Sequence, residues 1–229
     1  MKINTAFILC AGYGKRLNPI TLSKPKPLIE VKNKTLLTRT IELIFSLGIN
    51  NIKINSFYLP DQITNFVRNH KLRNKIEIIN DGSEILDTGG GIKNMIKHIR
   101  GDNFLVFNPD TLWDDNYITT VTDMIYFYEN NNLNNLLLVT NKKNSFDKNL
   151  KGDFNLENNL ITKELDKNYI YIGCQILSKE LFKNETNEKF SISNIWNKLI
   201  DTKDLHGYES KQNFYHLTNL EIFKKLKDL

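Results

Sequence analysis

The sequence predicts an α/β protein built around a doubly wound, mostly parallel sheet. Apolar, strand-like runs alternate with stretches of helical periodicity from residue 6 to about residue 140, and this alternation is typical of consecutive βαβ units. Single α/β domains of 229 residues are common. Since no internal repeat or Pro/Ser-rich linker divides the chain, we predict one domain over residues 1–229.

The elements of the first half follow in order. Ala6–Cys10 is a continuous apolar run, as in a buried parallel strand. Leucines and isoleucines at helical spacing predict a helix over 36–47, which Gly48 ends. The same reasoning predicts strands over 52–55, 76–79 and 104–107 and helices over 60–68 and 92–99.

The pattern changes in the second half. A helix over 117–129 and a buried strand over 136–139 continue the alternation. Short strands are then expected over 152–156, 160–162 and 169–177, and these predict a small antiparallel sheet. A helix with Ser191 as N-cap runs through Leu199, and a last amphipathic helix covers 220–226.

Composition narrows the class of protein. The net charge of +5 is mild and the basic residues are dispersed, so we expect no nucleic-acid partner. We expect a cytoplasmic protein without a membrane partner, because no cleavable leader or long apolar run is present. Cys10 and Cys174 lie in apolar runs without metal-ligand spacing and are expected to be buried, reduced thiols.

A glycine-rich, basic loop follows the first strand. Gly12 and Gly14 permit a tight turn whose backbone N–H groups can face a polyanion, and Lys15 and Arg16 add positive charge. Further on, Lys26 stands between two prolines, which restrict the backbone on either side. The loop matches neither the dinucleotide fingerprint nor the Walker A pattern. We interpret it as a phosphate-binding loop of another kind, with a purely structural turn as the alternative.

Two more stretches favour a nucleotide site. The glycines of Asp87-Thr88-Gly89-Gly90-Gly91 suit either close approach of a flat ligand or a loose helix start. The strand over 104–107 leads to Asp110, which would stand at the ligand-binding edge of a parallel sheet. One carboxylate there suits Mg²⁺, although Asp is also favoured in turns and as an N-cap.

The phrase G-x-G-x-R-L-x-P-x-T-x-x-x-P-K-P, from Gly12 to Pro27, resembles the signature of sugar-1-phosphate nucleotidyltransferases. The D-T-G-G-G-I stretch is similar to the group that contains N-acetylmuramate-1-phosphate uridylyltransferase. The resemblance implies a Rossmann-like mixed sheet with a small antiparallel sugar-side sheet. It also implies a mainly nucleotide-binding half over 1–140 and a mainly sugar-binding half over 141–229.

The resemblance also implies roles for individual residues, each at a position that matches a family motif. The implied catalytic residues are Arg16, Lys26 and Asp110. The implied nucleotide-binding residues are Leu9, Ala11, Gly12, Gly14, Lys15, Arg16, Thr88, Gly89 and Gly90. The implied sugar-binding residues are Asn108, Gly152, Asp153, Glu164 and Gly173. Asp110 would hold Mg²⁺, with Mn²⁺ as the alternative.

Two positions depart from the family pattern. Pro109 replaces the usual glycine before the aspartate, and His216 stands where the family often has a second metal-binding aspartate. His216 is therefore a doubtful metal ligand. The alternatives are a contact to phosphate and a packing role.

The resemblance implies a monomeric or small homo-oligomeric enzyme that converts a nucleoside triphosphate and a sugar 1-phosphate to a nucleotide sugar and pyrophosphate. UTP with N-acetylmuramate or hexose 1-phosphate is favoured, and guanylyl or thymidylyl transfer is the near alternative. Two alternative functions lie outside this class of enzyme. One is a choline-phosphate cytidylyltransferase, with Tyr169, Tyr171 and Trp196 around the ammonium group. The other is a non-catalytic nucleotide sensor.

Overall fold

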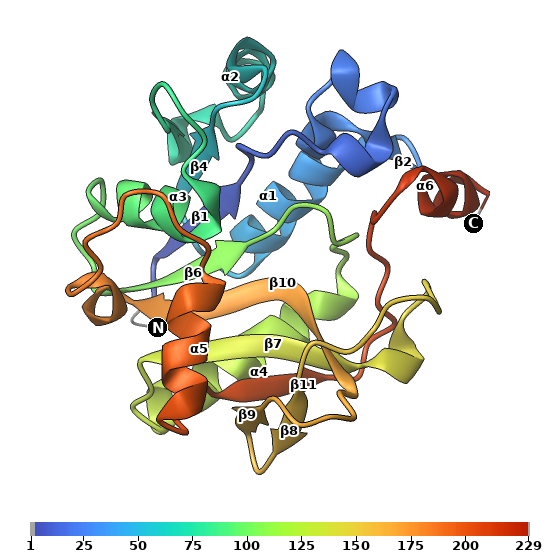
Figure 1. The fold of residues 1–229 in the computed structure, drawn as a ribbon. Coiled ribbons are helices and arrows are strands. Elements are labelled where there is room, and N and C mark those ends of the chain that lie inside the picture. The colour runs from blue at the N-terminus through green and yellow to red at the C-terminus, as the bar shows by residue number, and fades with distance from the viewer. Residues whose placement is uncertain (1–2, 229) are drawn as a thin grey trace.

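A computed structural model describes residues 3–228, and its centre is a seven-stranded sheet (Figure 1). The strand order is β11-β7-β10-β6-β1-β4-β5. The strands are β1 (Thr5–Leu9), β4 (Asn51–Ser56), β5 (Ile76–Asn80), β6 (Asn103–Phe107), β7 (Asn135–Asn141), β10 (Tyr169–Ser178) and β11 (Gly207–Ser210). β10 runs antiparallel to β6 and β7, and the other neighbouring pairs are parallel.

Helices cover both faces of this sheet (Figure 1). On one face, α1 (Leu36–Ser46), α2 (Pro60–Arg68) and α4 (Asn116–Asn130) contribute to the largest apolar cluster. On the other face, α3 (Asp87–Ile96) and α5 (Ser193–Asp201) contribute to a second cluster. The central strands β1 and β6 are therefore buried on both sides, which explains their continuous apolar sequences.

Shorter elements complete the chain. β2 (Glu30–Val31) pairs with β3 (Lys34–Thr35), and β8 (Asn155–Glu157) pairs with β9 (Leu160–Thr162). In the described part of the chain, 3-10 turns cover Lys15–Leu17, Ile20–Leu22, Lys26–Leu28, Arg73–Lys75, Lys142–Asn144 and Lys179–Phe182. The last helix, α6 (Leu220–Lys227), crosses to the N-terminal loop and buries Phe223 in a third cluster with Leu17.

The structure confirms the fold class: a mixed, mostly parallel sheet with helices on both faces and a small antiparallel pair. Three expected elements need correction. β10 belongs to the main sheet, so that the small antiparallel sheet expected in the second half consists of β8 and β9 alone. The strand expected over 152–156 forms only at 155–157. Ser191 is not the N-cap of α5, which begins at Ser193 after Ile192.

The largest correction concerns α3, which begins at Asp87 rather than at Ile92, so that the three glycines form its first turns. Glycine is a poor helix former, but these glycines are buried against other parts of the chain. A Cβ on Gly89 would lie 2.3 Å from the Phe190 ring, and one on Gly90 would lie 2.1 Å from the Glu188 carbonyl oxygen. Tertiary packing therefore decides the conformation of this stretch.

No helix within residues 3–228 has both the length and the apolar character that a membrane span requires.

Candidate functional site

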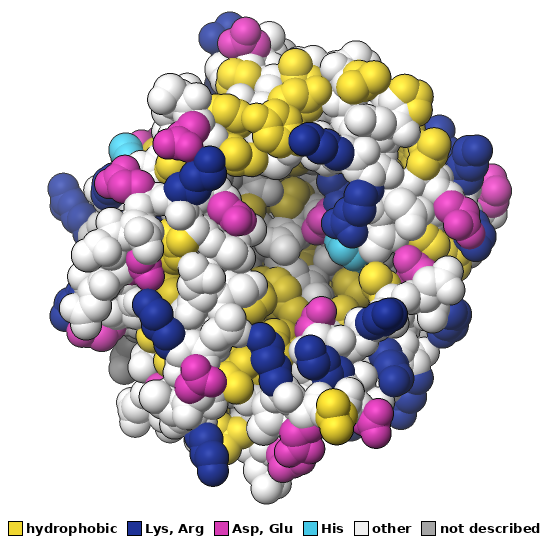
Figure 2. Space-filling model, in the orientation of Figure 1, with side chains coloured by type: hydrophobic (Ala, Val, Ile, Leu, Met, Phe, Trp, Pro, Cys, Tyr) yellow, Lys and Arg dark blue, Asp and Glu magenta, His cyan; other side chains and the backbone are white. Residues whose placement is uncertain are grey.

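A cavity of about 280 Å³ lies at the carboxyl ends of β1, β4 and β6. β1 stands between β4 and β6, so the strand order reverses at this point, and open α/β sheets bind ligands at such switch points. Figure 2 shows a central hollow with basic side chains and a histidine along one wall. The cavity is lined by Leu9, Cys10, Ala11, Gly12, Gly14, Arg16, Lys26, Pro27, Asn55, Ile85, Asp87, Thr88, Asn108, Pro109 and Asp110.

The glycine loop forms one wall of this cavity. Gly14 has a φ of 63°, and a Cβ there would lie 3.0 Å from Thr21 Cγ2 and 3.1 Å from Lys26 Cβ. The Thr21 hydroxyl donates a hydrogen bond to the Gly14 carbonyl oxygen at 3.0 Å. Glycine is needed at this position for both its backbone conformation and its lack of a side chain. The turn that follows places Arg16 at the cavity.

Two side chains from distant parts of the chain, Lys26 and His216, contact the carboxylate of Asp110. Lys26 Nζ lies 2.6 Å from Asp110 Oδ2, and His216 Nε2 lies 3.1 Å from the same oxygen. The closing segment is held there by its backbone, because Leu217 N–H donates to the Asp110 carbonyl oxygen at 2.8 Å. The side chains of Lys26, Asp110 and His216 are only 14%, 21% and 20% exposed, so their charges interact strongly.

Charge controls the ionisation of this carboxyl group. Burial raises the pKa of Asp110, but the charges of Lys26 and His216 and their hydrogen bonds outweigh burial and hold that pKa well below its usual range. Asp110 is therefore ionised at neutral pH. Burial, followed by the nearby Asp110 charge, raises the pKa of the Cys10 thiol. Cys10 is consequently a neutral wall of the cavity and not a nucleophile.

The residues at this position fit a divalent cation through one carboxylate. Both ion pairs of Asp110 use Oδ2. Oδ1 is therefore the oxygen that could bind a cation. Within residues 3–228, no group of three or more His, Cys, Asp or Glu side chains is placed to bind a metal ion. Mg²⁺ is often held by one or two carboxylates together with phosphate oxygens and water. The site therefore suits a cation that arrives with a phosphorylated ligand.

The structure brings together most of the residues predicted to bind nucleotide. Leu9, Ala11, Gly12, Gly14, Arg16 and Thr88 line the same cavity as the predicted catalytic residues Lys26 and Asp110. Lys15 lies in an adjoining concavity with Thr218, and its Nζ is 5.3 Å from the Tyr13 ring centroid. Gly89 and Gly90 do not belong to the described residues that line the cavity, because they pack against residues 188–190.

The residues predicted to bind sugar are more dispersed. Asn108 lines the cavity, and its N–H donates to the Gly173 carbonyl oxygen at 2.7 Å. Gly173 has a φ of 89° and packs directly against Asn108. Asp153 Oδ2 accepts a hydrogen bond from Tyr171 N–H at 3.0 Å, and Gly152 packs against the Lys167 carbonyl. Glu164 is exposed and lines a separate concavity beside β8 and β9.

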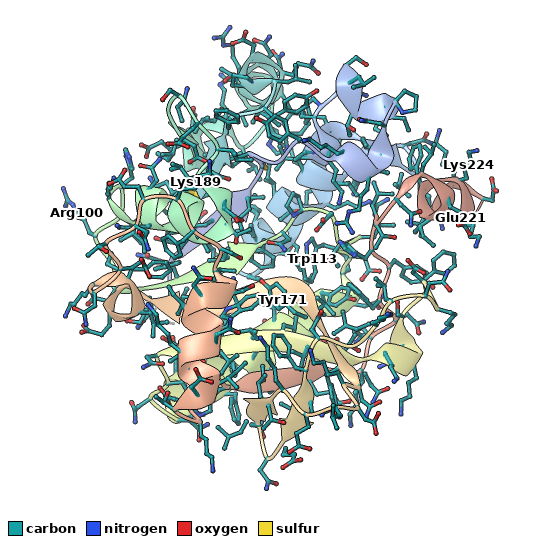
Figure 3. All side chains as sticks on the ribbon, viewed as in Figure 1. Arg100, Trp113, Tyr171, Lys189, Glu221 and Lys224 are labelled. Carbon is teal, nitrogen blue, oxygen red and sulfur yellow. The ribbon has the colours of Figure 1, made fainter. Side chains whose placement is uncertain are left out.

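Aromatic side chains lie near the cavity, and one of them contacts a residue of its lining. Trp113, labelled in Figure 3, is 1% exposed, and its Nε1 donates to the Asn108 carbonyl oxygen at 3.0 Å. Tyr171, also labelled, contacts Trp196 edge-on at 4.9 Å between ring centroids. Tyr169 lines the separate concavity, and the described residues that line the main cavity include none of Tyr169, Tyr171 and Trp196. Tyr169, Tyr171 and Trp196 therefore do not surround one point as an ammonium cage would.

Sequence reasoning did not select Asn55, Ile85 and Asp87, which also line the cavity. Asn55 carried a recognisable signal, because it is a polar residue near the end of an otherwise apolar parallel strand. Asp87 carried none. Its φ of 61° and its exposed position follow from the way α3 begins.

A switch-point cavity, a basic glycine loop and the ionised, largely buried carboxylate of Asp110 suit an α/β protein that binds phosphorylated ligands. The family model described as nucleotidyl transferase matches residues 5–149, well over half of the chain. The chain therefore belongs to the nucleotidyl transferase family.

Individual relatives differ in the nucleotide that their names specify. The chain is 24% identical to N-acetylmuramate alpha-1-phosphate uridylyltransferase of Caulobacter vibrioides, over 85% of this chain and 83% of that protein. It is 28% identical to the catalytic subunit beta of mannose-1-phosphate guanylyltransferase of Dictyostelium discoideum, over 75% of this chain. It spans 47% of that second protein, so the similarity concerns about half of it.

Solved structures share the fold. The crystal structure of HddC from Yersinia pseudotuberculosis, complexed with GMP-PN, matches with a TM-score of 0.79 and 22% sequence identity, over 99% of both chains. At this identity the likeness establishes the fold and nothing about the ligand of this chain.

Proposed function

We propose that this protein transfers a nucleotidyl group from a nucleoside triphosphate to a sugar 1-phosphate and releases pyrophosphate. The observation that carries the proposal is the meeting of Lys26 and Asp110 in a cavity walled by the glycine loop. An oxygen of the sugar phosphate attacks the α-phosphorus, a new P–O bond forms, and the bond to the β-phosphate breaks. The electron pair of that bond leaves with pyrophosphate, so no group on the protein is modified.

The side chains of the cavity act by position and charge, which is the usual form of catalysis in phosphoryl-type transfer. The backbone of the glycine loop and the cations Lys15 and Arg16 bind the triphosphate and the departing pyrophosphate. Lys26 binds the phosphates at the reacting centre. Because Lys26 is paired with Asp110 without ligand, its ammonium group is already held beside the cavity.

We further propose that Asp110 binds Mg²⁺, or Mn²⁺ in its place, together with phosphate oxygens. When bound, the cation supplies additional positive charge to neutralise the phosphates. His216 Nε2 lies 3.1 Å from Asp110 Oδ2, so Oδ1 is the oxygen that we propose for the cation. Asp110→Asn should keep the fold and abolish the binding of Mg²⁺ by the protein–UTP complex beyond the Mg²⁺ that free UTP binds, measured by calorimetry with and without protein. Normal metal affinity in this variant would remove Asp110 from the metal site.

UTP is the nucleotide that we favour, and N-acetylmuramate or hexose 1-phosphate is the favoured acceptor. The Caulobacter uridylyltransferase supports this choice, since the similarity extends over most of both chains. Guanylyl or thymidylyl transfer is the alternative, and the Dictyostelium relative favours guanylyl transfer over its matched part.

Release of pyrophosphate tests the proposal. UTP, GTP, CTP and dTTP are each combined with N-acetylmuramate 1-phosphate, glucose 1-phosphate, mannose 1-phosphate and choline phosphate, and pyrophosphate is measured. Release with UTP and one of the sugar phosphates is the expected result. Release only with CTP and choline phosphate would overturn the acceptor class. Nucleotide binding without release from any pair would identify a nucleotide sensor.

A further inference from the structure

One segment of the chain, residues 55–62, contacts the glycine loop at several points. The first contact is made by Asn55, which stands near the end of β4 and is 2% exposed. Its Oδ1 accepts a hydrogen bond from Cys10 N–H at 2.8 Å. Cys10 is the first residue after β1, where strand pairing stops. A side-chain amide, and not the sheet, therefore determines where the loop begins.

Asp81 orients this amide. Asn55 Nδ2 donates to Asp81 Oδ2 at 2.7 Å, and a carboxylate can only accept. The opposite orientation of the amide would place two oxygens together, so Oδ1 of Asn55 must face Cys10. Asp81 is 7% exposed, and its burial raises the pKa of the carboxyl group. A buried carboxylate is costly to maintain, which indicates that this position has a specific task.

The third glycine of the Asp87–Gly91 stretch makes room for the same amide. A Cβ on Gly91 would lie 2.6 Å from Asn55 Nδ2 and 3.6 Å from Asp81 Oδ2. Any larger residue would displace Asn55 from Cys10. Gly91 therefore serves a packed polar network and not a bound ligand.

The far end of the glycine loop is held by residues just beyond β4. The Tyr58 hydroxyl donates to the Thr21 carbonyl oxygen at 2.7 Å, and Gln62 Nε2 donates to the Ser23 carbonyl oxygen at 2.8 Å. The Tyr58 ring also packs on Tyr13, with 5.2 Å between centroids. Between these contacts and Cys10 lie Gly14, Lys15 and Arg16. The loop is thus attached at both ends to one short segment.

We propose that residues 55–62 position the glycine loop for the triphosphate, with Asn55 and Tyr58 as the positioning residues. The proposal rests on the proposed function in taking a nucleoside triphosphate as the ligand of the loop. A loop rich in glycine has many accessible conformations, and holding it in the binding conformation lowers the cost of binding. Displacement of a phosphate by about 1 Å can cost about a hundredfold in rate.

Two conservative variants test this role. Tyr58→Phe keeps the ring and removes the hydroxyl. Asp81→Asn keeps the shape of the side chain but allows the amide group of Asn55 to flip. Each should weaken binding of UTP with Mg²⁺, measured by calorimetry, by about threefold to tenfold, the effect of one hydrogen bond. The KM for UTP should rise while the KM for the sugar phosphate stays constant. Amide exchange over residues 10–23 should become faster.

Matched controls lie on α4, on the other side of the molecule from the loop. Tyr126→Phe and Asp123→Asn make the same chemical changes at exposed positions, and neither should change nucleotide binding or exchange over 10–23. Wild-type affinity and wild-type exchange in both Tyr58→Phe and Asp81→Asn would overturn the proposal. Faster exchange throughout the chain with a lowered Tm would also overturn it, because the contacts would then serve global stability.

The same measurements separate this proposal from the proposed function. If the wild-type protein binds UTP but releases no pyrophosphate from any pair, the proposed reaction fails while binding and exchange still decide the role of residues 55–62. If UTP does not bind, GTP is the second probe. If neither binds, the ligand assumed for the loop is wrong and this proposal falls with it.

Discussion

Asp110 is the residue at which the chemistry of this protein converges. Its carboxylate receives Lys26 from the loop after β1 and His216 from the closing segment. Lys26 and His216 are far apart in the sequence, yet both contact Oδ2. Without ligand, the negative charge of Asp110 is balanced by these cationic and polar groups. Under the proposed function, binding of phosphate redistributes the contacts of Lys26, and substitutions here should affect turnover more than folding.

Lys26→Ala should lower kcat/KM by about a hundredfold or more, the scale for losing one contact to transition-state charge. Lys34→Ala is the matched control, because Lys34 forms an exposed ion pair with Glu42 at 2.7 Å, and such pairs contribute little. Steady-state kinetics with thermal melts check both variants. Near-wild-type turnover in Lys26→Ala would remove Lys26 from the mechanism.

His216 distinguishes this chain from the pattern with a second aspartate. His216→Asp should lower the Mg²⁺ concentration that gives half-maximal activity, because a second carboxylate would stand beside Asp110. His216→Ala should lower kcat/KM by about tenfold, since it removes a hydrogen bond to a charged group. Titration of activity with Mg²⁺ measures both effects. If neither variant changes the kinetics, His216 has only a packing role, stacked on Phe214 at 5.6 Å.

At the scale of elements, α3 is where local preference and tertiary packing disagree. Its first turns consist largely of glycine, which disfavours a helix, but Gly90 N–H donates to the Phe190 carbonyl oxygen at 3.1 Å. Phe190 N–H in turn donates to the Leu86 carbonyl oxygen at 3.1 Å. The start of α3 is thus joined to the segment before α5 by backbone hydrogen bonds, which require a surface without side chains.

Gly90→Ala should lower the free energy of unfolding by about 1–3 kcal/mol, the usual cost of overpacking. Its Cβ would stand 2.1 Å from the Glu188 carbonyl oxygen, and a backbone atom cannot move aside cheaply. Gly101→Ala is the control, because the nearest atom to its Cβ would be 3.9 Å away. Denaturant titration of both variants measures the difference, and equal stability would contradict the packing described for α3.

At the scale of the whole molecule, the fold buries both thiols. Cys10 and Cys174 are 1% and 0% exposed. Burial raises the pKa of both thiols, and the Asp110 charge adds to the effect at Cys10. A raised pKa leaves less thiolate at a given pH, and the thiolate is the reactive form.

Alkylation by iodoacetamide at pH 8 should therefore be at least about a hundredfold slower in the folded protein than in urea, because reaction requires opening of the structure. Mass spectrometry of the two cysteine peptides measures the rates. Labelling of either cysteine in buffer as fast as in urea would contradict the buried placement.

Much of the fold was predictable from the sequence because it depends on local patterns. The apolar run of β1, the helical spacing of α1 and the Pro60 start of α2 each match the structure within one or two residues. These elements are buried in the ordinary way, so hydrophobic periodicity identifies them. The glycine loop was predictable for a similar reason, since the turn at Gly14 depends on residues close in sequence.

The rest depended on contacts between distant segments. The sequence by itself determined the class of fold, the position of the glycine loop and the carboxylate after β6. Only the tertiary structure showed that β10 enters the main sheet, that α3 begins with glycines, and that Asn55 lines the cavity. In each case the deciding contact joins residues far apart in the chain: β10 pairs with β6, Gly90 with Phe190, and Asn55 with Cys10 and Asp81. Spacing along a sequence records local periodicity, whereas such contacts exist only once the chain has packed.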